Sequence, residues 1–595
     1  MLSRSVDFST AFGRKVSPSP SAGTSTRTRT QTSLLASVAV LAWVVLWFAG
    51  LGARALGEPD EGRYAEVARE MLHSGDWITP TLNGFTFFDK PALQYWATAA
   101  AYALLGTGEA AARLWPALTG LLSMLAVAWA GKRLYGLRCG VTAAMVLGGS
   151  MLFTLGAHVA TLDLGVAAFL NIAICFFLVA QFDPTAVAQR RAFNLAGWAC
   201  LALAVLSKGL IGMVLPAMTL LVFMACRRDW RLLGRLNPVL GLALLLAIAA
   251  PWFVVVCLRN PRFFDYFFIH EHFARFLTTQ DKRVHSVFFF LPVVLLGLCP
   301  WVAFLRWPQR AQATASERAA DVFLLCWVGV VFVFFSLSHS KLPFYILPVF
   351  PALALLIARS IGQLQRVQVQ RRLQWIGGLA ALLVLIGVTM AVFDPPLIDR
   401  LQLRSAALCA ALGMAVLAFG ALLGAGLLAR GCGPLLALSC LGFGTLAAWQ
   451  SQLIGQTALA AHLSAEPTAA LMQPYLTVDS NVFMVDTYLR GLPFYLRRLS
   501  TLVADPADDV APGLGYRPTG YLSNVAAFEA RWRRAPGALA VVNRHTLPQL
   551  RQDAIPMQIL GAVGGRVVIR QPVTSLHDAP GDTFSTVNAA TRTLR

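Results

Sequence analysis

Carboxylates gather directly after the first apolar run of the chain. Asp60 and Glu61 follow Pro59, and a further carboxylate, Asp163, stands at the start of a later apolar run. Two carboxylates held close together can orient an acceptor, accept a proton or hold a cation. The same residues also have structural explanations, because Asp60 and Glu61 can start a solvated helix in which Arg63 pairs with Glu66, and Asp163 can cap a helix.

Lysine is scarce in this chain, and half of the lysines lie close to residues that break helices. The chain contains six lysines, and Lys90, Lys208 and Lys341 each lie within two residues of a proline or glycine. A cation at a broken helix end near lipid headgroups is well placed to hold phosphate. Isolated lysines more commonly just extend toward the headgroups. The recurrence of one arrangement at three positions favours a phosphate site.

Metal ligands could come from the polar segment His270-Glu271-His272, with Asp89 completing the set. Histidine nitrogen and carboxylate oxygen suit zinc, and carboxylate oxygen suits magnesium. Histidines that serve only an interface are more common than such a site. A divalent metal is therefore one expectation and a metal-free loop the other. No glycine-rich nucleotide loop and no Ser or Cys nucleophile motif is present, so no organic cofactor is indicated.

The elements that carry these residues must be largely membrane-spanning. The chain is 57% hydrophobic and 13% charged, whereas soluble domains carry about 25% charged residues. Apolar stretches long enough to cross a bilayer recur from Leu34 to about Leu453, and a segment of ordinary polarity follows. The formal net charge of +20 comes mostly from arginines in short loops, and no nucleic-acid module is present, so a nucleic-acid partner is excluded.

Orientation decides which loops share a side of the membrane. A cytoplasmic N-terminus and a first span at 34–51 place the segment 53–90 outside. The short segment Ala92–Leu105 is either a second span or an interfacial or re-entrant helix, and only the latter keeps the later basic loops inside. This choice predicts about thirteen spans and places all the candidate residues above on the outer side.

The chain is expected to have three parts. Residues 1–33, rich in Ser, Thr, Pro and Arg, predict a disordered basic cytoplasmic segment. Residues 34–455 form the transmembrane domain, and residues 456–595 form a small soluble α/β domain on the outer side. Strand-like runs at 482–485 and 539–542 alternate with helix-like stretches in this last part, which is typical of an α/β unit.

Taken in order, these motifs resemble those of the lipid A aminoarabinose transferases and of the wider protein O-mannosyltransferase-like superfamily. The motifs extend over most of the chain: Asp60-Glu61-Gly-Arg63-Tyr64-Ala-Glu66, Asp89-Lys90-Pro91, Tyr95-Trp96, Leu162-Asp163, Ser207-Lys208-Gly209, Glu271-His272 with Arg275-Phe276, Lys341-Leu342-Pro343 with Tyr345, Asp486-Thr-Tyr488, and Leu492-Pro-Phe-Tyr495-Leu-Arg497. Each motif is weak alone, and the ordered set is specific. The family pattern has Glu where this chain has Asp89, so the charge is kept and its reach is shorter.

The resemblance implies both a fold and an activity. The fold is a polytopic α-helical protein of the bacterial inner membrane, with juxtamembrane helices in the first periplasmic loop and a C-terminal periplasmic α/β domain. The activity is inverting glycosyl transfer from an undecaprenyl-phosphate-linked sugar, 4-amino-4-deoxy-L-arabinose, to a phosphate of lipid A. Lipid A modified in this way carries less negative charge, which weakens the binding of cationic peptides such as polymyxin.

The resemblance also distributes roles among the residues. Asp60 is the catalytic carboxylate, supported by Asp163 and Glu61. Asp89 and His272 are the candidate metal ligands. The candidate contacts to the carrier phosphate are Lys90, Arg63, Lys208, Lys341, Tyr345 and Arg275.

Two other readings stay open on the sequence alone. The same chemistry could use another sugar or a protein acceptor, as in protein O-glycosylation. A lipid or sugar transporter is disfavoured, because transporters carry ionisable residues in mid-span and repeated halves, and neither is evident in the sequence.

Overall fold

The computed structural model describes residues 22–274, 285–306, 313–393, 404–504, 510–511, 513 and 518–572. The chain divides into two compact units, Met1–Ala49 and Gly50–Arg595. The element described in the first unit is helix α1 (Ala22–Phe48), whose apolar part is Leu34–Phe48. Helix α1 thus begins inside the segment predicted to be disordered, since a helix nucleated in an apolar segment extends readily into adjoining residues.

The second unit is a polytopic helical membrane protein with a sheet domain. Within the described residues, seven helices are long and apolar enough to cross a membrane, or eight if a pair bent by 68° counts as one span. The bent pair is α5 (Leu137–Gly148) and α6 (Met151–Ala157). The seven are α4 (Glu109–Tyr135), α7 (Leu162–Phe182), α11 (Pro238–Arg259), α14 (Ala315–Leu337), η4 (Pro343–Val349) continued by α15 (Phe350–Gly362), α16 (Arg366–Phe393) and α18 (Arg404–Ala429).

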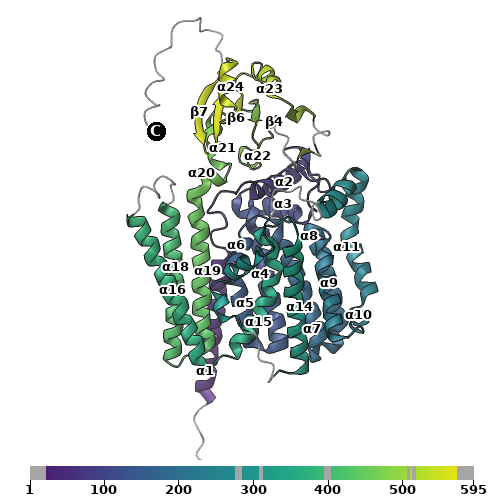
Figure 1. Ribbon diagram of the computed structural model, residues 1–595, viewed down its shortest axis with the longest axis vertical. Coiled ribbons are helices and arrows are strands. Elements are labelled where there is room, and N and C mark those ends of the chain that lie inside the picture. The colour runs from purple at the N-terminus through teal and green to yellow at the C-terminus, as the bar shows by residue number, and fades with distance from the viewer. Residues whose placement is uncertain are drawn as a thin grey trace, which may run out of the picture. The chain divides into compact units, whose positions relative to one another are not determined.

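Shorter or more polar helices complete the bundle of the second unit (Figure 1). They are α8 (Arg190–Lys208), α9 (Ile211–Arg227), α10 (Leu232–Arg235), α13 (Phe290–Gly297) and α19 (Pro434–Gly455), with a π-helical segment η2 (Asp265–Ala274). Several of these are apolar but fall short of the length or hydropathy of a full span. The finding of seven or eight spans by length and composition is therefore lower than the predicted count of about thirteen.

Two helices stand between α1 and α4 in the sequence, as predicted for the first outer loop. They are α2 (Asp60–Ser74) and α3 (Leu93–Leu105), which pack against each other. A helix of the length of α3 covers about 20 Å, well short of the roughly 30 Å of a hydrocarbon core. Between them lies a hairpin of β1 (Thr81–Leu82) and β2 (Phe85–Thr86), whose Asn83-Gly84 turn has positive φ at both residues, as a tight hairpin requires.

The C-terminal domain contains a mixed six-stranded sheet with order β5-β4-β3-β6-β8-β7. Strands β3, β4, β5 and β6 are parallel, whereas β8 is antiparallel to both β6 and β7. The strands are β3 (Val482–Val485), β4 (Thr501–Val503), β5 (Tyr521–Leu522), β6 (Leu539–Asn543), β7 (Gln558–Val563) and β8 (Arg566–Arg570). Helices α21 (Glu466–Met472), α22 (Leu492–Leu496), α23 (Val525–Trp532) and α24 (Leu547–Gln552) accompany the sheet. The predicted α/β character of this part is confirmed.

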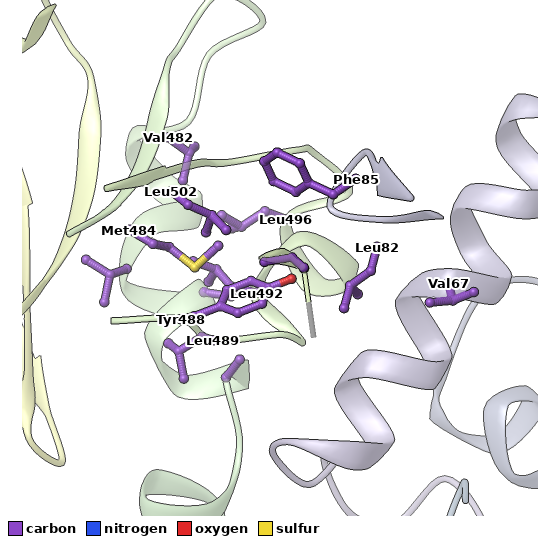
Figure 2. Close-up of a cluster of buried hydrophobic side chains, with 14 of the residues drawn as sticks. Val67, Leu82, Phe85, Val482, Met484, Tyr488, Leu489, Leu492, Leu496 and Leu502 are labelled. Atoms are coloured by element: carbon purple, nitrogen blue, oxygen red, sulfur yellow. The ribbon is translucent and has the colours of Figure 1, made fainter. Parts of the chain in front are cut away.

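Side chains of β3 alternate between two apolar cores, so the sheet is covered on both faces. Phe483 packs with α23 and α24 on one face. Met484 packs on the other face, in a core that also contains Val67 of α2 and Leu82 and Phe85 of the hairpin. Figure 2 shows side chains of this second core, which come from the segment between α1 and α4 and from the C-terminal domain. One face of the sheet is therefore buried against the elements that carry the candidate site.

Candidate active site

Asp60 is the first residue of α2, and its side chain is partly open to solvent. The carboxylate is 38% exposed and pairs with Arg63, one turn later, whose Nη2 donates to Oδ1 over 2.8 Å. The Arg63–Glu66 pair considered from the sequence is not formed, because Glu66 pairs with Arg69 one turn further along α2. Pro59 is the N-cap residue of α2, and the Asp60 carboxylate stands in the first turn of the helix.

Asp163 is ion-paired and does not cap its helix. It lies in the first turn of α7, where the N-cap residue is Thr161, and Lys208 at the C-terminal end of α8 donates to its Oδ1. The ammonium of Lys208 also lies 4.1 Å from the centroid of the Tyr345 ring, a cation–π arrangement. The neighbouring helices α7 and α8 therefore meet the distant η4 at one ion pair.

Asp89 and Lys90 join the same group from the loop before α3. The hydroxyl of Tyr266 donates to Asp89 Oδ1 over 3.0 Å, and Arg63 Nη1 lies 3.7 Å from Oδ2. Lys90 Nζ donates to the backbone carbonyl of Asp89 over 2.8 Å. Arg63 thus bridges the carboxylates of Asp60 and Asp89, and the phenol of Tyr266 ties the π-helical segment to this loop.

A cavity of about 50 Å³ collects these side chains. Three cations and three carboxylates line it, so its formal charge is balanced before any ligand binds. An anionic ligand must therefore share Arg63 and Lys208 with the carboxylates that they already pair with, which favours a ligand of moderate charge. The lining residues are Asp60, Arg63, Tyr64, Asp89, Lys90, Thr161, Leu162, Asp163, Lys208, Leu342 and Tyr345.

A second, larger cavity of about 320 Å³ adjoins the first. It extends along the start of η4 and the segment after α19, with Phe344 and Gln456 among its walls, and it also contains Glu58 and Glu61. Four residues line both cavities: Asp60, Thr161, Asp163 and Leu342. Asp60 and Asp163, which the sequence singled out, therefore stand where the small cavity meets the larger one.

Glu61 differs from Asp60 although it is the next residue. It is 3% exposed, and its carboxylate pairs with Arg54 and with Arg113 of α4, over 2.6 and 2.7 Å. Backbone N–H groups of Gly57 and Ala160 also donate to it. Burial raises the pKa of Glu61, but Arg113 and Arg54 outweigh burial and lower it to about 2. Glu61 therefore stays ionised and ties the start of α2 to Arg113 of α4.

Thr161 and Arg113 are functional candidates that the sequence did not single out. Thr161 is 5% exposed and lines both cavities, yet its Oγ1 has no hydrogen-bond partner among the described residues. A buried hydroxyl without a partner is costly, so it marks a place where a ligand group fits. Arg113 is fully buried near the start of an apolar helix, and such a charge is itself a signal of function.

Lys341 is a predicted phosphate contact that does not line the small cavity. Lys341 is 4% exposed, and its ammonium donates to the backbone carbonyls of Ser338 and His285, over 2.5 and 3.2 Å. Arg275 and the side chain of His272 lie outside the described residues. Their assignments to the phosphate and to a metal stay predictions.

In the part of the chain that the structure describes, no cluster of metal-ligating side chains supports the expected metal site. No group of three His, Cys, Asp or Glu side chains there could hold a metal ion. Asp89, the described member of the predicted pair, is engaged by Tyr266 and Arg63 instead. The described residues therefore do not form a metal site by themselves.

Two family models match separate parts of the chain. A model described as dolichyl-phosphate-mannose-protein mannosyltransferase matches residues 89–254, and one described as aminoarabinose transferase C-terminal domain matches residues 468–571. The first match covers Asp89, Lys90, Asp163 and Lys208, and the second covers most of the sheet domain. Two separate segments of the second unit thus match models whose descriptions both name sugar transferases.

Curated relatives share about a third of their residues with this chain. The undecaprenyl phosphate-alpha-4-amino-4-deoxy-L-arabinose arabinosyl transferase of Edwardsiella ictaluri is 33% identical over 360 residues, which is 60% of this chain and 64% of that protein. A protein of the same description from Proteus mirabilis is 35% identical over 328 residues, 54% of this chain and 58% of that protein. The alignments thus span less than two thirds of these relatives.

Solved structures extend the likeness over nearly the whole chain. ArnT from Cupriavidus metallidurans is 33% identical and superimposes with a TM-score of 0.83 in its apo state and 0.81 when bound to undecaprenyl phosphate. Each comparison covers 91% of this chain and 98% of the other. The fold, both domain matches and the ordered motifs agree, and the chain belongs to the aminoarabinose transferase family.

Proposed function

We propose that this chain is an inverting glycosyltransferase of the bacterial inner membrane. It moves 4-amino-4-deoxy-L-arabinose from undecaprenyl phosphate to a phosphate of lipid A on the periplasmic face. The resulting loss of negative charge protects the cell from polymyxin and other cationic peptides. One relative's crystal structure contains undecaprenyl phosphate, which supports this carrier for the present chain as well.

The junction of the two cavities carries the proposal. The small cavity holds Arg63, Lys90 and Lys208, which suit the phosphate of a sugar carrier. The larger cavity has room for part of an acceptor and reaches the small one at Asp60 and Asp163. A donor in one space and an acceptor in the other would meet at these carboxylates, as a single displacement requires.

In the proposed step an oxygen of the acceptor phosphate attacks the anomeric carbon of the sugar. The bond from that carbon to the carrier phosphate breaks, and undecaprenyl phosphate leaves with the bonding electron pair. Lys90, Lys208 and Arg63 stabilise the charge that grows on the departing phosphate. Asp60 orients the acceptor and takes its proton if the acceptor arrives protonated, with Asp163 assisting. Attack opposite the leaving group inverts the anomeric centre.

The remaining candidates take supporting roles in this proposal. Glu61 is committed to Arg54 and Arg113, so it acts by fixing the loop of Asp60. Thr161 offers its unpartnered hydroxyl to the sugar or to the acceptor at the junction. Tyr345 contacts the carrier phosphate through its hydroxyl. Lys341 and Arg275 complete the proposed phosphate contacts, and Lys341 would exchange its backbone carbonyl partners for the phosphate.

A divalent metal plays no part in the step as written. Zinc or magnesium at Asp89 and His272 stays a prediction, because the described residues do not assemble a ligand set there. The three cations of the small cavity supply the positive charge that the leaving phosphate needs.

The orientation and span count also belong to the proposal. About thirteen spans, with α2 and α3 lying at the periplasmic surface, would place the cavities and the C-terminal domain in the periplasm. The abundance of arginine in the predicted inner loops supports this orientation. Membrane lipids are then the medium that presents both substrates.

The test is the mass spectrum of lipid A from cells with and without the gene, and from cells complemented with the Asp60→Ala variant. We expect the mass of one aminopentose on a lipid A phosphate, absent without the gene and not restored by the variant. A different sugar mass would change the donor and keep the mechanism. Unmodified lipid A under conditions of expression would overturn the acceptor, and glycoproteins would then be analysed for a protein acceptor.

A further inference from the structure

The segment that leads into Asp60 is held by the C-terminal part of the chain. The backbone N–H of Leu56, a fully buried residue, donates to the hydroxyl of Tyr495 over 2.7 Å. The N–H of Glu58 donates to the carbonyl of Leu463 over 2.6 Å, next to an antiparallel bridge between Gly57 and Ser464. The backbone before the catalytic carboxylate is therefore fixed at successive residues by elements that follow α19.

The side chain of Glu58 makes the same connection a second time. Its two carboxylate oxygens accept hydrogen bonds from the backbone N–H groups of Gly491 and Arg490, over 2.6 and 3.0 Å. Gly491 is the N-cap residue of α22. Glu58 therefore binds the start of α22, two residues before Asp60.

Backbone touches backbone at Gly62 and Gly491. A Cβ atom added to Gly62 would lie 2.7 Å from both Cα and N of Gly491, and one added to Gly491 would lie 2.7 Å from Oε1 of Glu58. Glycine is a poor residue for the interior of a helix, so its presence in the first turn of α2 calls for a reason such as this close approach.

Helix α22 also inserts an aromatic side chain next to α2. Phe494 is 4% exposed and packs in a core with Ala65 and Ala68 of α2 and Tyr102 of α3. The motif Leu492-Pro-Phe-Tyr495, which the sequence tied to the family but to no task, is thus one of the parts of the C-terminal domain that contact α2 and the segment before it.

We propose that α22 is a positioning element for Asp60. Glu58 fixes the loop to α22, Glu61 fixes it to Arg113 of α4, and Asp60 lies between the two anchors with its carboxylate at the junction of the cavities. A displacement of about 1 Å at a reacting group can reduce a rate about a hundredfold, so docking of the C-terminal domain sets turnover. This inference rests on the proposed glycosyl transfer, because it assigns a role in that reaction.

The experiment compares variants of the full-length protein, purified in detergent and assayed with the undecaprenyl-phosphate-linked aminopentose and lipid A. Gly62→Ala adds one methyl group at the contact with Gly491, while it favours the local helix. Tyr495→Phe removes only the hydroxyl that accepts from Leu56. Gly565→Ala in the turn before β8 is the matched control, because its added Cβ would meet nothing within 4 Å.

We expect kcat to fall at least tenfold in Gly62→Ala and severalfold in Tyr495→Phe, with Gly565→Ala unchanged. Binding of undecaprenyl phosphate, measured directly by calorimetry, should change much less than kcat does, because Arg63 of α2 is one of three cations in the small cavity and Lys90 and Lys208 lie on other elements. A general loss of folding would lower binding and turnover together. A fall in kcat without a comparable loss of undecaprenyl phosphate binding therefore identifies a positioning role.

Wild-type kcat in both Gly62→Ala and Tyr495→Phe would overturn the inference. An Asp60→Ala variant assayed beside them keeps the two proposals apart. If Asp60→Ala is inactive while both contact variants are normal, the glycosyltransferase mechanism stands and the positioning role falls. If the wild-type protein transfers no sugar, or Asp60→Ala transfers it normally, the proposed function itself is wrong.

Discussion

The ammonium of Lys208 lies 4.1 Å from the centre of the Tyr345 ring while it pairs with Asp163. One cation thereby connects a catalytic candidate with an aromatic residue from a different helix. The ring and the carboxylate together fix where this charge stands in the small cavity. Tyr345 thus has two properties, its hydroxyl and its aromatic ring, and substitutions can test each of them separately.

Tyr345→Phe keeps the ring beneath Lys208 and removes the hydroxyl. We expect the KM for the lipid-linked donor to rise about tenfold, because a hydrogen bond to a charged group contributes roughly 1.5–3 kcal/mol. Tyr345→Leu should raise it further, since the cation–π contact, worth about 0.5–2 kcal/mol, is lost as well. Initial-rate kinetics across donor concentrations measure both effects. Equal KM values in wild type and both variants would remove Tyr345 from the donor site.

Thr161→Val should make the protein more stable and less active. The variant replaces a buried hydroxyl that has no partner among the described residues by a methyl group of similar size, which removes a cost of roughly 1–3 kcal/mol. The same hydroxyl is proposed to contact a substrate, so kcat/KM should fall about tenfold. Thermal unfolding in detergent and the transfer assay give the two values. Thr161→Ser is the control and should keep most of the activity.

Glu61→Gln should destabilise the protein. The substitution leaves Arg54 and Arg113 buried with one negative charge fewer, and breaking a buried ion pair costs about 3–5 kcal/mol. We expect a clear fall in the unfolding temperature, measured on purified protein by thermal shift. Glu466→Gln, at a half-buried position at the start of α21, is the comparison and should change stability by less than about 1 kcal/mol. A Glu61→Gln protein as stable as wild type would contradict the anchoring role.

Glu58 should make stability depend on pH near neutrality. Burial raises its pKa from an ordinary value of 4.5 to about 7, although hydrogen bonds from Gly491 and Arg490 and the charges of Arg490 and Arg566 act in the opposite direction. The folded protein therefore holds this proton more tightly than the unfolded chain. The resulting stability is fully present below pH 4.5 and is lost as the pH rises through about 7.

Glu58→Gln removes this titration and provides the comparison for it. The unfolding temperature of wild type relative to the variant should be highest near pH 5 and should decline toward pH 8, because only wild type loses a proton in this range. Thermal shift measured on both proteins across that range tests the expectation. A difference that does not vary with pH would show that Glu58 does not titrate there.

The grouping of site residues was predictable from charge and hydropathy. The positive-inside pattern placed Asp60, Lys90, Asp163 and Lys208 on one side, and the structure brings all four to one cavity. The sheet of the C-terminal domain and the short α3 also followed from local patterns, because alternation and length are properties of the segment itself.

The different roles of the neighbouring carboxylates could not be predicted from the sequence. Glu58, Asp60 and Glu61 look equivalent in the sequence, and only contacts with Gly491 and Arg113, far along the chain, distinguish them. Lys341 likewise resembled Lys208, since both adjoin helix breakers. Their different partners depend on tertiary packing that no local pattern encodes.

Because Glu58 and Glu61 are both held in place, the number of residues between them determines where the Asp60 carboxylate lies. Each residue of a helix rotates the chain by about 100°, so one inserted residue between Pro59 and Glu61 would swing the carboxylate away from the cavity even if every side chain were kept. Exchange of Asp for Glu moves the charge by the length of one methylene group. An inserted or deleted residue instead rotates the carboxylate out of its position on the helix. Proteins with this activity should therefore tolerate substitutions here better than insertions or deletions.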